Sequence, residues 1–133
     1  MIKDAEPDGE ARAAQVDDPR ITRVGTILRK TRLDEFPQFF NVLRGEMSLV
    51  GPRAERDQLV AKYQKEIPFY RARLLVKPGI SGWAQITSGY ASSIFATALK
   101  LEYDLYYIKH RTVAMDITIL LRTFGTVFGF KGR

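Results

Sequence analysis

The 133-residue chain contains no cysteine and only one histidine, His110. Without cysteine there is no disulfide framework, no thiolate zinc site and no cysteine nucleophile, a composition compatible with a reducing cytoplasm. A single histidine also excludes a metal cluster built from histidine ligands. The sequence therefore belongs neither to the disulfide-stapled proteins nor to the proteins that hold metals with thiolates or imidazoles.

Long hydrophobic runs are also missing, so no stretch qualifies as a signal peptide or a transmembrane helix. The most apolar segment, residues 113–130, is interrupted by Asp116 and Arg122 and is followed by Lys131 and Arg133. This pattern fits a helix that lies in a lipid headgroup layer, and it fits a core helix equally well. Composition alone does not choose between the two.

Acidic residues are scarce outside the first 18 positions. Residues 1–18 hold six acids and two bases, which leaves nine acids and nineteen bases in residues 19–133. We interpret residues 1–18 as a polar lead-in and residues 19–133 as one modest, strongly basic domain. Such a domain suits anionic lipid, a nucleotide-sugar or a lipid phosphate. Nucleic acid is not an expected partner, because no nucleic-acid-binding motif is visible.

Hydrophobic periodicity predicts a small single domain that is mainly α with short β elements and has amphipathic helices suited to membrane association. A glycine cap is expected to end one helix at Arg44-Gly45. Helices are predicted at residues 20–30, 36–43, 55–75 with a break at Pro68, 94–109 and 113–130, and short strands at 47–50 and 83–86.

The helix at 36–43 should begin just before Pro37, since proline is tolerated only in the first turn. Its apolar residues recur with helical spacing, which predicts one buried face, formed by Phe36, Phe39, Phe40 and Leu43. Asp34 and Glu35 then lie at the helix entrance, where backbone N–H groups favour anions. Acidic residues at this position are commonly caps, but an ionised carboxylate can also be a nucleophile.

Three blocks of the sequence decide between these readings: LRKTRLDEFPQFFNVLRGEMSLVGPRAE, KPGISGWAQI and LEYDLYYIKHRTVAMDITIL. In order and spacing they resemble the bacterial sugar transferase family, the monotopic polyprenyl-phosphate hexose-1-phosphate transferases that initiate exopolysaccharide, capsule and glycan assembly. The resemblance runs from the first residues to about Thr126. It implies an enzyme that transfers a phosphosugar from a UDP-sugar to polyprenyl phosphate and releases UMP.

The same resemblance implies roles for individual residues. Asp34 would be the nucleophile that forms an aspartyl-phosphosugar intermediate. Glu35 would hold a magnesium ion that neutralises the diphosphate. Arg29 matches a basic position expected to bind phosphate, and Arg32 is a weaker candidate for the same role.

The segment VGPRAE resembles the family's Pro-Arg-Pro-Glu turn. Pro52, Arg53 and Glu55 are retained, while Ala54 stands where a second proline is usual. Arg53 can offer a bidentate fork to a phosphate. The loss of a fixed φ at Ala54 is expected either to loosen the turn or to let the helix at 55–66 start differently.

Two acidic residues, Asp104 and Asp116, also lie in segments that resemble the family, and each belongs to an otherwise apolar predicted helix. Because an unpaired acid is costly in apolar surroundings, Asp116 should face the arginines of the site, in either a structural salt bridge or a substrate-binding role. Gln85 and Trp83 are candidates to line the nucleotide pocket, although a packed tryptophan is the simpler expectation.

Members of this family carry a hydrophobic membrane-entering helix upstream of the matched region, and the resemblance implies that this sequence starts after it. The expected location of the full-length protein is the cytoplasmic face of the bacterial inner membrane. The competing hypothesis is a non-catalytic membrane-surface or partner-binding module that reuses the fold, and the retained acidic and arginine motifs argue against it.

Overall fold

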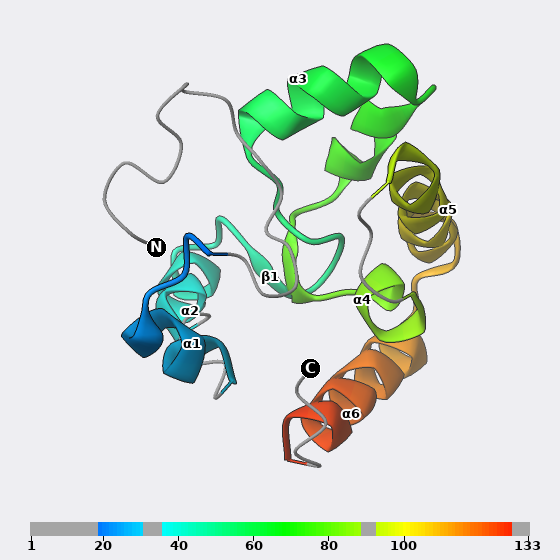
Figure 1. The fold of residues 1–133 in the computed structure, drawn as a ribbon. Coiled ribbons are helices and arrows are strands. Elements are labelled where there is room, and N and C mark those ends of the chain that lie inside the picture. The colour runs from blue at the N-terminus through cyan, green and yellow to red at the C-terminus, as the bar shows by residue number, and fades with distance from the viewer. Residues whose placement is uncertain (1–18, 31–35, 89–92, 129–133) are drawn as a thin grey trace.

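The computed structural model describes residues 19–30, 36–88 and 93–128 and is mainly helical with one short sheet (Figure 1). This confirms the predicted fold class. In chain order the elements are α1 (Arg23–Lys30), α2 (Phe36–Leu43), β1 (Ser48–Val50), α3 (Asp57–Glu66), the 3-10 helix η2 (Tyr70–Leu75), β2 (Gly79–Ser81), α4 (Trp83–Thr87), α5 (Ile94–His110) and α6 (Val113–Phe128).

The sheet consists of β1 and β2, which pair in parallel with Ser48 opposite Gly79 and Val50 opposite Ser81. It lies at the centre of the molecule, between α3 and α6 (Figure 1). The strand predicted at residues 83–86 is wrong. That segment is the short helix α4, because the N–H groups of Gln85 and Ile86 donate back to Gly82 O instead of to a neighbouring strand.

Local side-chain and backbone hydrogen bonds fix the ends of three helices. Gly45 adopts a left-handed φ of 76° after α2, which confirms the predicted glycine cap. Ser93 Oγ accepts the N–H of Ala96 at 3.1 Å and begins α5. Thr112 Oγ1 accepts the N–H of Met115 at 3.2 Å at the start of α6. These caps satisfy N–H groups that a helix start leaves unpaired.

The helical segment predicted at residues 55–75 is divided in two, as the break expected at Pro68 indicated. α3 ends at Glu66, Phe69 takes a left-handed φ of 59°, and η2 follows. The tighter 3-10 geometry moves later residues off the α-helical stripe. Leu74 and Leu75, at the end of the segment predicted as helical, are therefore 54% and 77% exposed.

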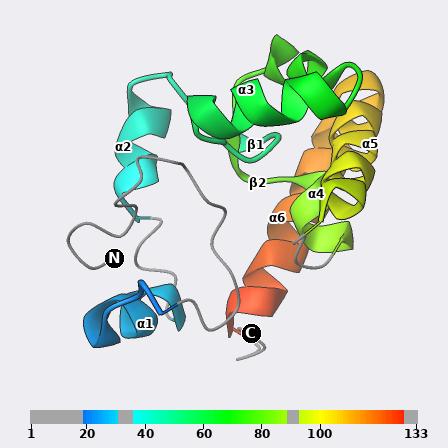
Figure 2. The ribbon, with the colours of Figure 1, turned by 45° about the horizontal axis from the view of Figure 1, so that its top comes forward.

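Two small clusters of buried side chains form the core, and α5 contributes to both. One contains Val60, Ile67, Tyr70 and Leu101, and the other contains Val50, Tyr107 and Ile119. Leu101 and Tyr107 of α5 enter one cluster each, Ile119 of α6 enters the second, and Figure 2 shows the two helices on the same side of the sheet. The helices of the second half thus fix the position of the sheet and of the turns that follow its strands.

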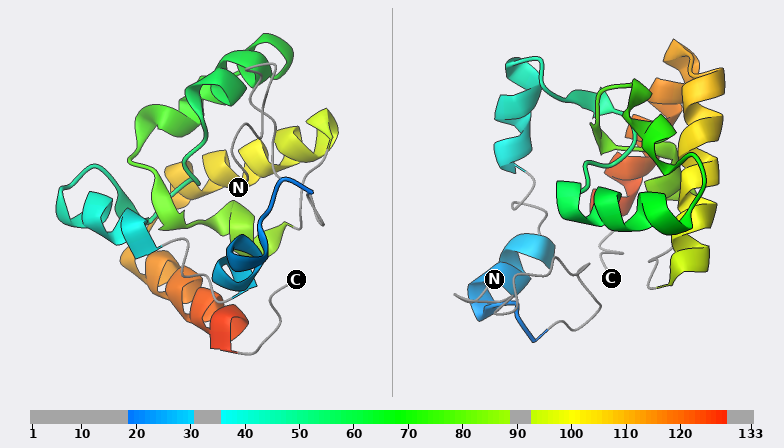
Figure 3. Two further views of the ribbon diagram at one scale, coloured as in Figure 1. Left: turned by 60° about the vertical axis from the view of Figure 1, so that its left-hand side comes forward. Right: turned by 90° about the horizontal axis from the view of Figure 1, so that it is seen from above.

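The apolar face of α2 is not buried by the described residues, contrary to the prediction. Its side chains Phe36, Phe39, Phe40 and Leu43 are between 45% and 84% exposed. Periodicity identified the face correctly, but α2 contacts β1 and, like α1, lies to one side of the other helices (Figure 3). Within the described ranges, no helix is long and apolar enough to span a bilayer.

Candidate functional site

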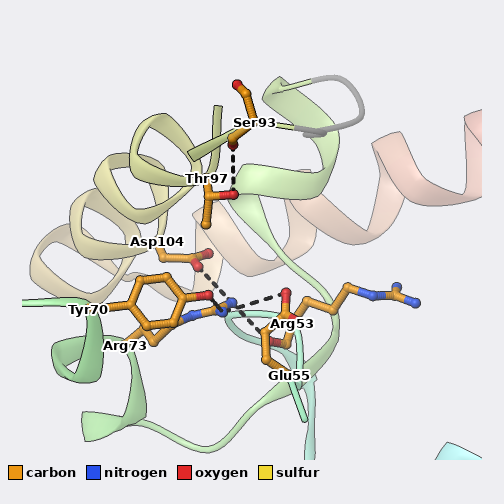
Figure 4. A network of polar contacts seen from close by, with 7 residues as sticks. All are labelled: Arg53, Glu55, Tyr70, Arg73, Ser93, Thr97 and Asp104. Carbon is orange, nitrogen blue, oxygen red and sulfur yellow. Dashed lines mark hydrogen bonds and ion pairs between the residues drawn. The ribbon is translucent and has the colours of Figure 1, made fainter. Parts of the chain in front are cut away.

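Backbone hydrogen bonds hold the turn after β1 against β2. The N–H of Gly51 donates to Ser81 O and the N–H of Gly79 donates to Pro52 O, both at 2.9 Å. Arg53 continues the contact as an isolated bridge with Gly79. The Arg53 side chain is exposed and extends away from the polar network behind the turn (Figure 4). The turn therefore presents a guanidinium group from a fixed backbone.

The polar network behind this turn is centred on Arg73, which is only 6% exposed (Figure 4). Arg73 Nη2 forms an ion pair with Asp104 Oδ2 and donates to the backbone oxygen of Arg53, both at 2.9 Å. Arg73 Nη1 donates to Tyr70 Oη at 2.9 Å and lies 3.7 Å from Glu55 Oε1. One buried guanidinium thus joins η2, α5 and both sides of the turn.

Burial shifts the protonation equilibria in this network. It raises the pKa of Asp104 to about 6, although the Arg73 charge and hydrogen bond act in the opposite direction. Burial raises the pKa of Tyr70 to about 12, and it lowers the pKa of Lys100, where Glu55 acts in the opposite direction. At neutral pH Asp104 is mostly ionised, but burial has brought its titration close to neutrality.

The free energy of unfolding of the unchanged protein, taken relative to that of the Asp104→Asn variant, should be larger at pH 4 than at pH 7. The pKa of about 6 in the folded state exceeds the usual 3.8. The folded state therefore holds a proton that the unfolded state releases, and this stability is lost as the pH rises through 6. The difference between the unfolding free energies of the two proteins should change by about 2 kcal/mol between these pH values. Urea titrations at both pH values measure it, and a pH-independent difference would contradict the shift.

A small cavity of about 220 Å³ opens beside the turn. Charged groups and apolar side chains share its wall, which is formed by Pro52, Arg53, Ala54, Glu55, Asp57, Arg73, Leu74, Val76 and Pro78. The arrangement brings two predicted site residues, Arg53 and Glu55, to one place. It also adds Arg73, which the sequence did not indicate.

Asp116 forms a second polar centre at the start of α6. Tyr107 Oη donates to Asp116 Oδ1 at 2.7 Å, and burial together with this carboxylate raises the pKa of Tyr107, while Arg111 lowers it. Among the described residues, the hydrogen-bond partner of Asp116 is thus a tyrosine, and the expected arginine partner is not found there. Asp116, Tyr107 and Arg111 line a groove of about 650 Å³ that also includes Lys77 and the exposed Leu75.

Three predicted site residues, Arg32, Asp34 and Glu35, lie outside the described residues, as does the proposed nucleophile–metal pair they contain. Arg29 is described and is half-buried near the end of α1. The structure therefore brings Arg53 and Glu55 together, places Asp116 in the neighbouring groove, and gives no position for the carboxylate pair.

Gln85 and Trp83 lie on α4 and line neither of these two cavities. The Gln85 amide nitrogen donates to Ile80 O at 3.4 Å, and its Oε1 is buried without a hydrogen-bond partner among the described residues. Trp83 packs on the second core cluster and stacks with Tyr106 at a centroid distance of 6.3 Å. The simpler expectation for the tryptophan, a packed side chain, is confirmed.

Comparison with known proteins identifies the family. Residues 1–130 match the family model described as bacterial sugar transferase. The chain belongs to the bacterial sugar transferase family. The match includes all three sequence blocks, the turn that carries Arg53 and the helix that carries Asp116.

Relatives of this sugar transferase chain have specific names. It is 49% identical over its full length to a UDP-N-acetylgalactosamine-undecaprenyl-phosphate N-acetylgalactosaminephosphotransferase from Aeromonas hydrophila, of which it covers 31%. It is 44% identical to UDP-glucose:undecaprenyl-phosphate glucose-1-phosphate transferases from Xanthomonas campestris pv. campestris and Escherichia coli K12, with 89% and 92% of the chain and 25% and 27% of each relative covered. The chain thus spans about a quarter to a third of these relatives.

The described carboxylates of this sugar transferase chain that lie near the two cavities have protein partners. Glu55 and Asp104 face Arg73, and Asp116 accepts a hydrogen bond from Tyr107. Over residues 19–30, 36–88 and 93–128 no group of three potential ligands is gathered. Mg²⁺ prefers hard oxygen ligands such as carboxylates. Glu35 therefore stays the predicted magnesium ligand.

Sequence reasoning missed Arg73 and Tyr107, the two residues that hold the acidic side chains of α5 and α6. A signal for Arg73 was available, because it lies three residues after the buried Tyr70 and so on the same face of a tight helix. A basic side chain buried at such a position requires an acidic partner, and Asp104, in an apolar helix, requires a basic one.

Proposed function

We propose that this protein transfers a sugar phosphate from a UDP-sugar to a polyprenyl phosphate and so initiates the assembly of a bacterial glycan such as an exopolysaccharide or a capsule. The observation that carries the proposal is the family match over residues 1–130. The names of the related proteins, which specify UDP-sugars and undecaprenyl phosphate, support both substrates. The reaction joins two negatively charged reactants, which suits the basic body of the chain.

The proposed reaction has two steps. A carboxylate oxygen of Asp34 attacks the phosphorus next to the sugar, the bond to the bridging oxygen breaks, and UMP leaves with that oxygen. An oxygen of polyprenyl phosphate then attacks the same phosphorus and displaces the carboxylate. The product is polyprenyl-diphosphate-sugar, and Asp34 returns to its initial state.

The other site residues have mainly electrostatic roles in this proposal. The exposed guanidinium of Arg53 binds a phosphate of the nucleotide-sugar as a bidentate donor, and Arg29 and Arg32 add positive charge. Glu55 shares the cavity of the Arg53 turn. Such preorganised donors stabilise charge that develops on the transferred phosphoryl group.

Asp116 and Gln85 complete the proposed set of substrate contacts. Asp116 has one carboxylate oxygen engaged by Tyr107 and lies in a groove large enough to accept part of a ligand. Gln85 offers a buried oxygen that has no partner among the described residues. Glu35 is the proposed ligand of Mg²⁺, which when bound would neutralise diphosphate charge.

Transfer into lipid tests the proposal. The whole protein is incubated with radiolabelled UDP-sugar and Mg²⁺, with or without undecaprenyl phosphate, and the organic phase is extracted. Label should enter that phase only when the lipid phosphate is present. A correctly folded protein that gives no lipid-linked label with UDP-glucose, UDP-galactose or either N-acetylated counterpart would support the non-catalytic alternative instead.

We also propose that α6 contacts the membrane surface at the cytoplasmic face of the inner membrane. Ile119 is fully buried, so one side of α6 belongs to the core. Another side carries exposed apolar residues at helical spacing, Val113, Ile117, Leu121 and Phe124, which are between 52% and 76% exposed. An exposed apolar stripe on a basic protein is suited to an anionic headgroup layer.

Replacing Leu121 and Phe124 together by glutamate should weaken binding of the 133-residue chain to vesicles of phosphatidylglycerol and phosphatidylcholine by about tenfold or more, because two large apolar side chains are lost from the contact. Co-sedimentation at low salt measures this. Thr118→Glu is the matched control, since Thr118 is exposed on the same helix about 100° from the stripe. Equal binding by all three proteins would remove α6 from the proposed membrane contact.

A further inference from the structure

The peptide bond between Arg53 and Ala54 is the point at which the site turn meets the buried network. Arg73 Nη2 donates to the carbonyl oxygen of Arg53 at 2.9 Å, across twenty positions of sequence. The Arg53 side chain itself is exposed and extends the other way (Figure 4). A contact to this carbonyl restricts rotation of the peptide plane and thereby the direction in which the Arg53 guanidinium leaves the backbone.

Arg73 is itself held in place. Its two terminal nitrogens contact Asp104 Oδ2 and Tyr70 Oη at 2.9 Å each, so η2 and α5 fix the guanidinium before it reaches the turn. The group is buried and cannot exchange these partners for water without local opening. A planar guanidinium offers several donors in a rigid fork, a geometry that a lysine ammonium does not reproduce.

Ala54 adds a reason for this contact. The residue after Arg53 is not a proline, so its φ is not restricted by a ring, and the turn was expected to be loose for that reason. The structure describes a turn whose 53–54 peptide is instead held from outside by a side chain of η2. In this chain, the contact from Arg73 therefore supplies a restraint on the 53–54 peptide that residue 54 does not supply.

We propose that Arg73 is a positioning residue that orients Arg53 for phosphate binding by holding the 53–54 peptide, a role that the alanine at position 54 makes necessary. The inference rests on the proposed phosphosugar transfer, in which Arg53 contacts the nucleotide-sugar. If the inference holds, the effect of a substitution at position 73 on activity depends on the residue at position 54. If Arg73 serves stability alone, the two effects are independent.

The test measures kcat and KM for UDP-sugar with the whole protein carrying Arg73→Lys, Ala54→Pro or both. Arg73→Lys should lower kcat/KM about tenfold or more in protein that remains folded by circular dichroism. Ala54→Pro alone should change kcat/KM less than twofold. In the double variant the proline should restore most of the lost kcat/KM. An equal loss with and without the proline would overturn the inference.

Tyr70→Phe is the matched control, because it removes a hydrogen bond from the same guanidinium without touching the contact to Arg53 O. Because Asp104 Oδ2 and Arg53 O still engage Nη2, Tyr70→Phe should lower stability and should lower kcat/KM less than Arg73→Lys does. If Tyr70→Phe and Arg73→Lys lose activity in proportion to their loss of stability, Arg73 has only a structural role.

Hydrogen exchange separates a failure of this inference from a failure of the proposed function. Amides of residues 51–55 should exchange at least about fivefold faster in Arg73→Lys than in the unchanged protein, whatever reaction the site performs, and Ala54→Pro should reverse part of the increase. Unchanged exchange would overturn the inference, whereas absent transfer by the unchanged protein contradicts only the proposed function. If Arg73→Lys does not fold, Ala54→Gly replaces it, and a tenfold loss of kcat/KM in that variant would show that residue 54 fixes the turn, not Arg73.

Discussion

Asp34→Asn is expected to reduce phosphosugar transfer by about a thousandfold or more while the protein stays folded. Asparagine keeps the shape of the side chain and an oxygen that can cap the following helix. It lacks the negative charge that makes the carboxylate a nucleophile, so the covalent step is lost. The assay is release of UMP from a UDP-sugar by the whole protein, with folding checked by circular dichroism.

A second neutralised carboxylate provides the control for this experiment. Glu102 is exposed on α5, and Glu102→Gln should transfer phosphosugar within about twofold of the unchanged rate. A folded Asp34→Asn protein that turns over as fast as the Glu102→Gln protein would end the proposal that Asp34 is the nucleophile. The helix-cap role would then be the better interpretation of Asp34.

The second large effect concerns folding. Gly79→Ala is expected to lower the unfolding free energy by about 3 kcal/mol or more, because a methyl group on Gly79 would overlap the backbone nitrogen of Gly51 and come within 2.6 Å of its Cα. Backbone cannot move aside as a flexible side chain does. The strands β1 and β2 would have to separate, and with them the turn that carries Arg53. Urea unfolding followed by circular dichroism measures the change.

Gly125→Ala is the matched control for Gly79→Ala. Gly125 lies in α6, and a methyl group there meets nothing within 4 Å. Alanine is the better helix former by about 1 kcal/mol, so this variant should be as stable as the unchanged protein or more stable. Equal destabilisation by the two substitutions would contradict the close approach of the two strands.

Local patterns predicted much of this fold. The cap at Gly45 and the helices α5 and α6 follow from residue chemistry and spacing within one turn of chain. The position of β2 could not be predicted in this way. Gly79 in β2 must be a glycine because its Cα lies against the backbone of Gly51, which is far away in sequence. Periodicity also showed that α2 has an apolar face without showing what covers it.

The candidate site could likewise be predicted only in part from the sequence. Motif resemblance identified Arg53 and Glu55, and the structure brings them to one turn. The support of that turn by Arg73 and Asp104 depends on three segments meeting in space. Asp104 was noted in the sequence as an acid in an apolar helix, but Arg73 was not identified as its partner. Only their burial and mutual distance reveal that they act together.

Transfer of a phosphosugar is tested most directly by following the sugar and the adjacent phosphate of the UDP-sugar separately. UDP-sugar labelled separately in the sugar and in the phosphate next to it is incubated with the whole protein, Mg²⁺ and undecaprenyl phosphate. The account predicts that both labels enter the lipid in equal amounts and that the released nucleotide is UMP. Sugar label alone in the lipid, with release of UDP, would mean glycosyl transfer and would contradict phosphosugar transfer by this protein.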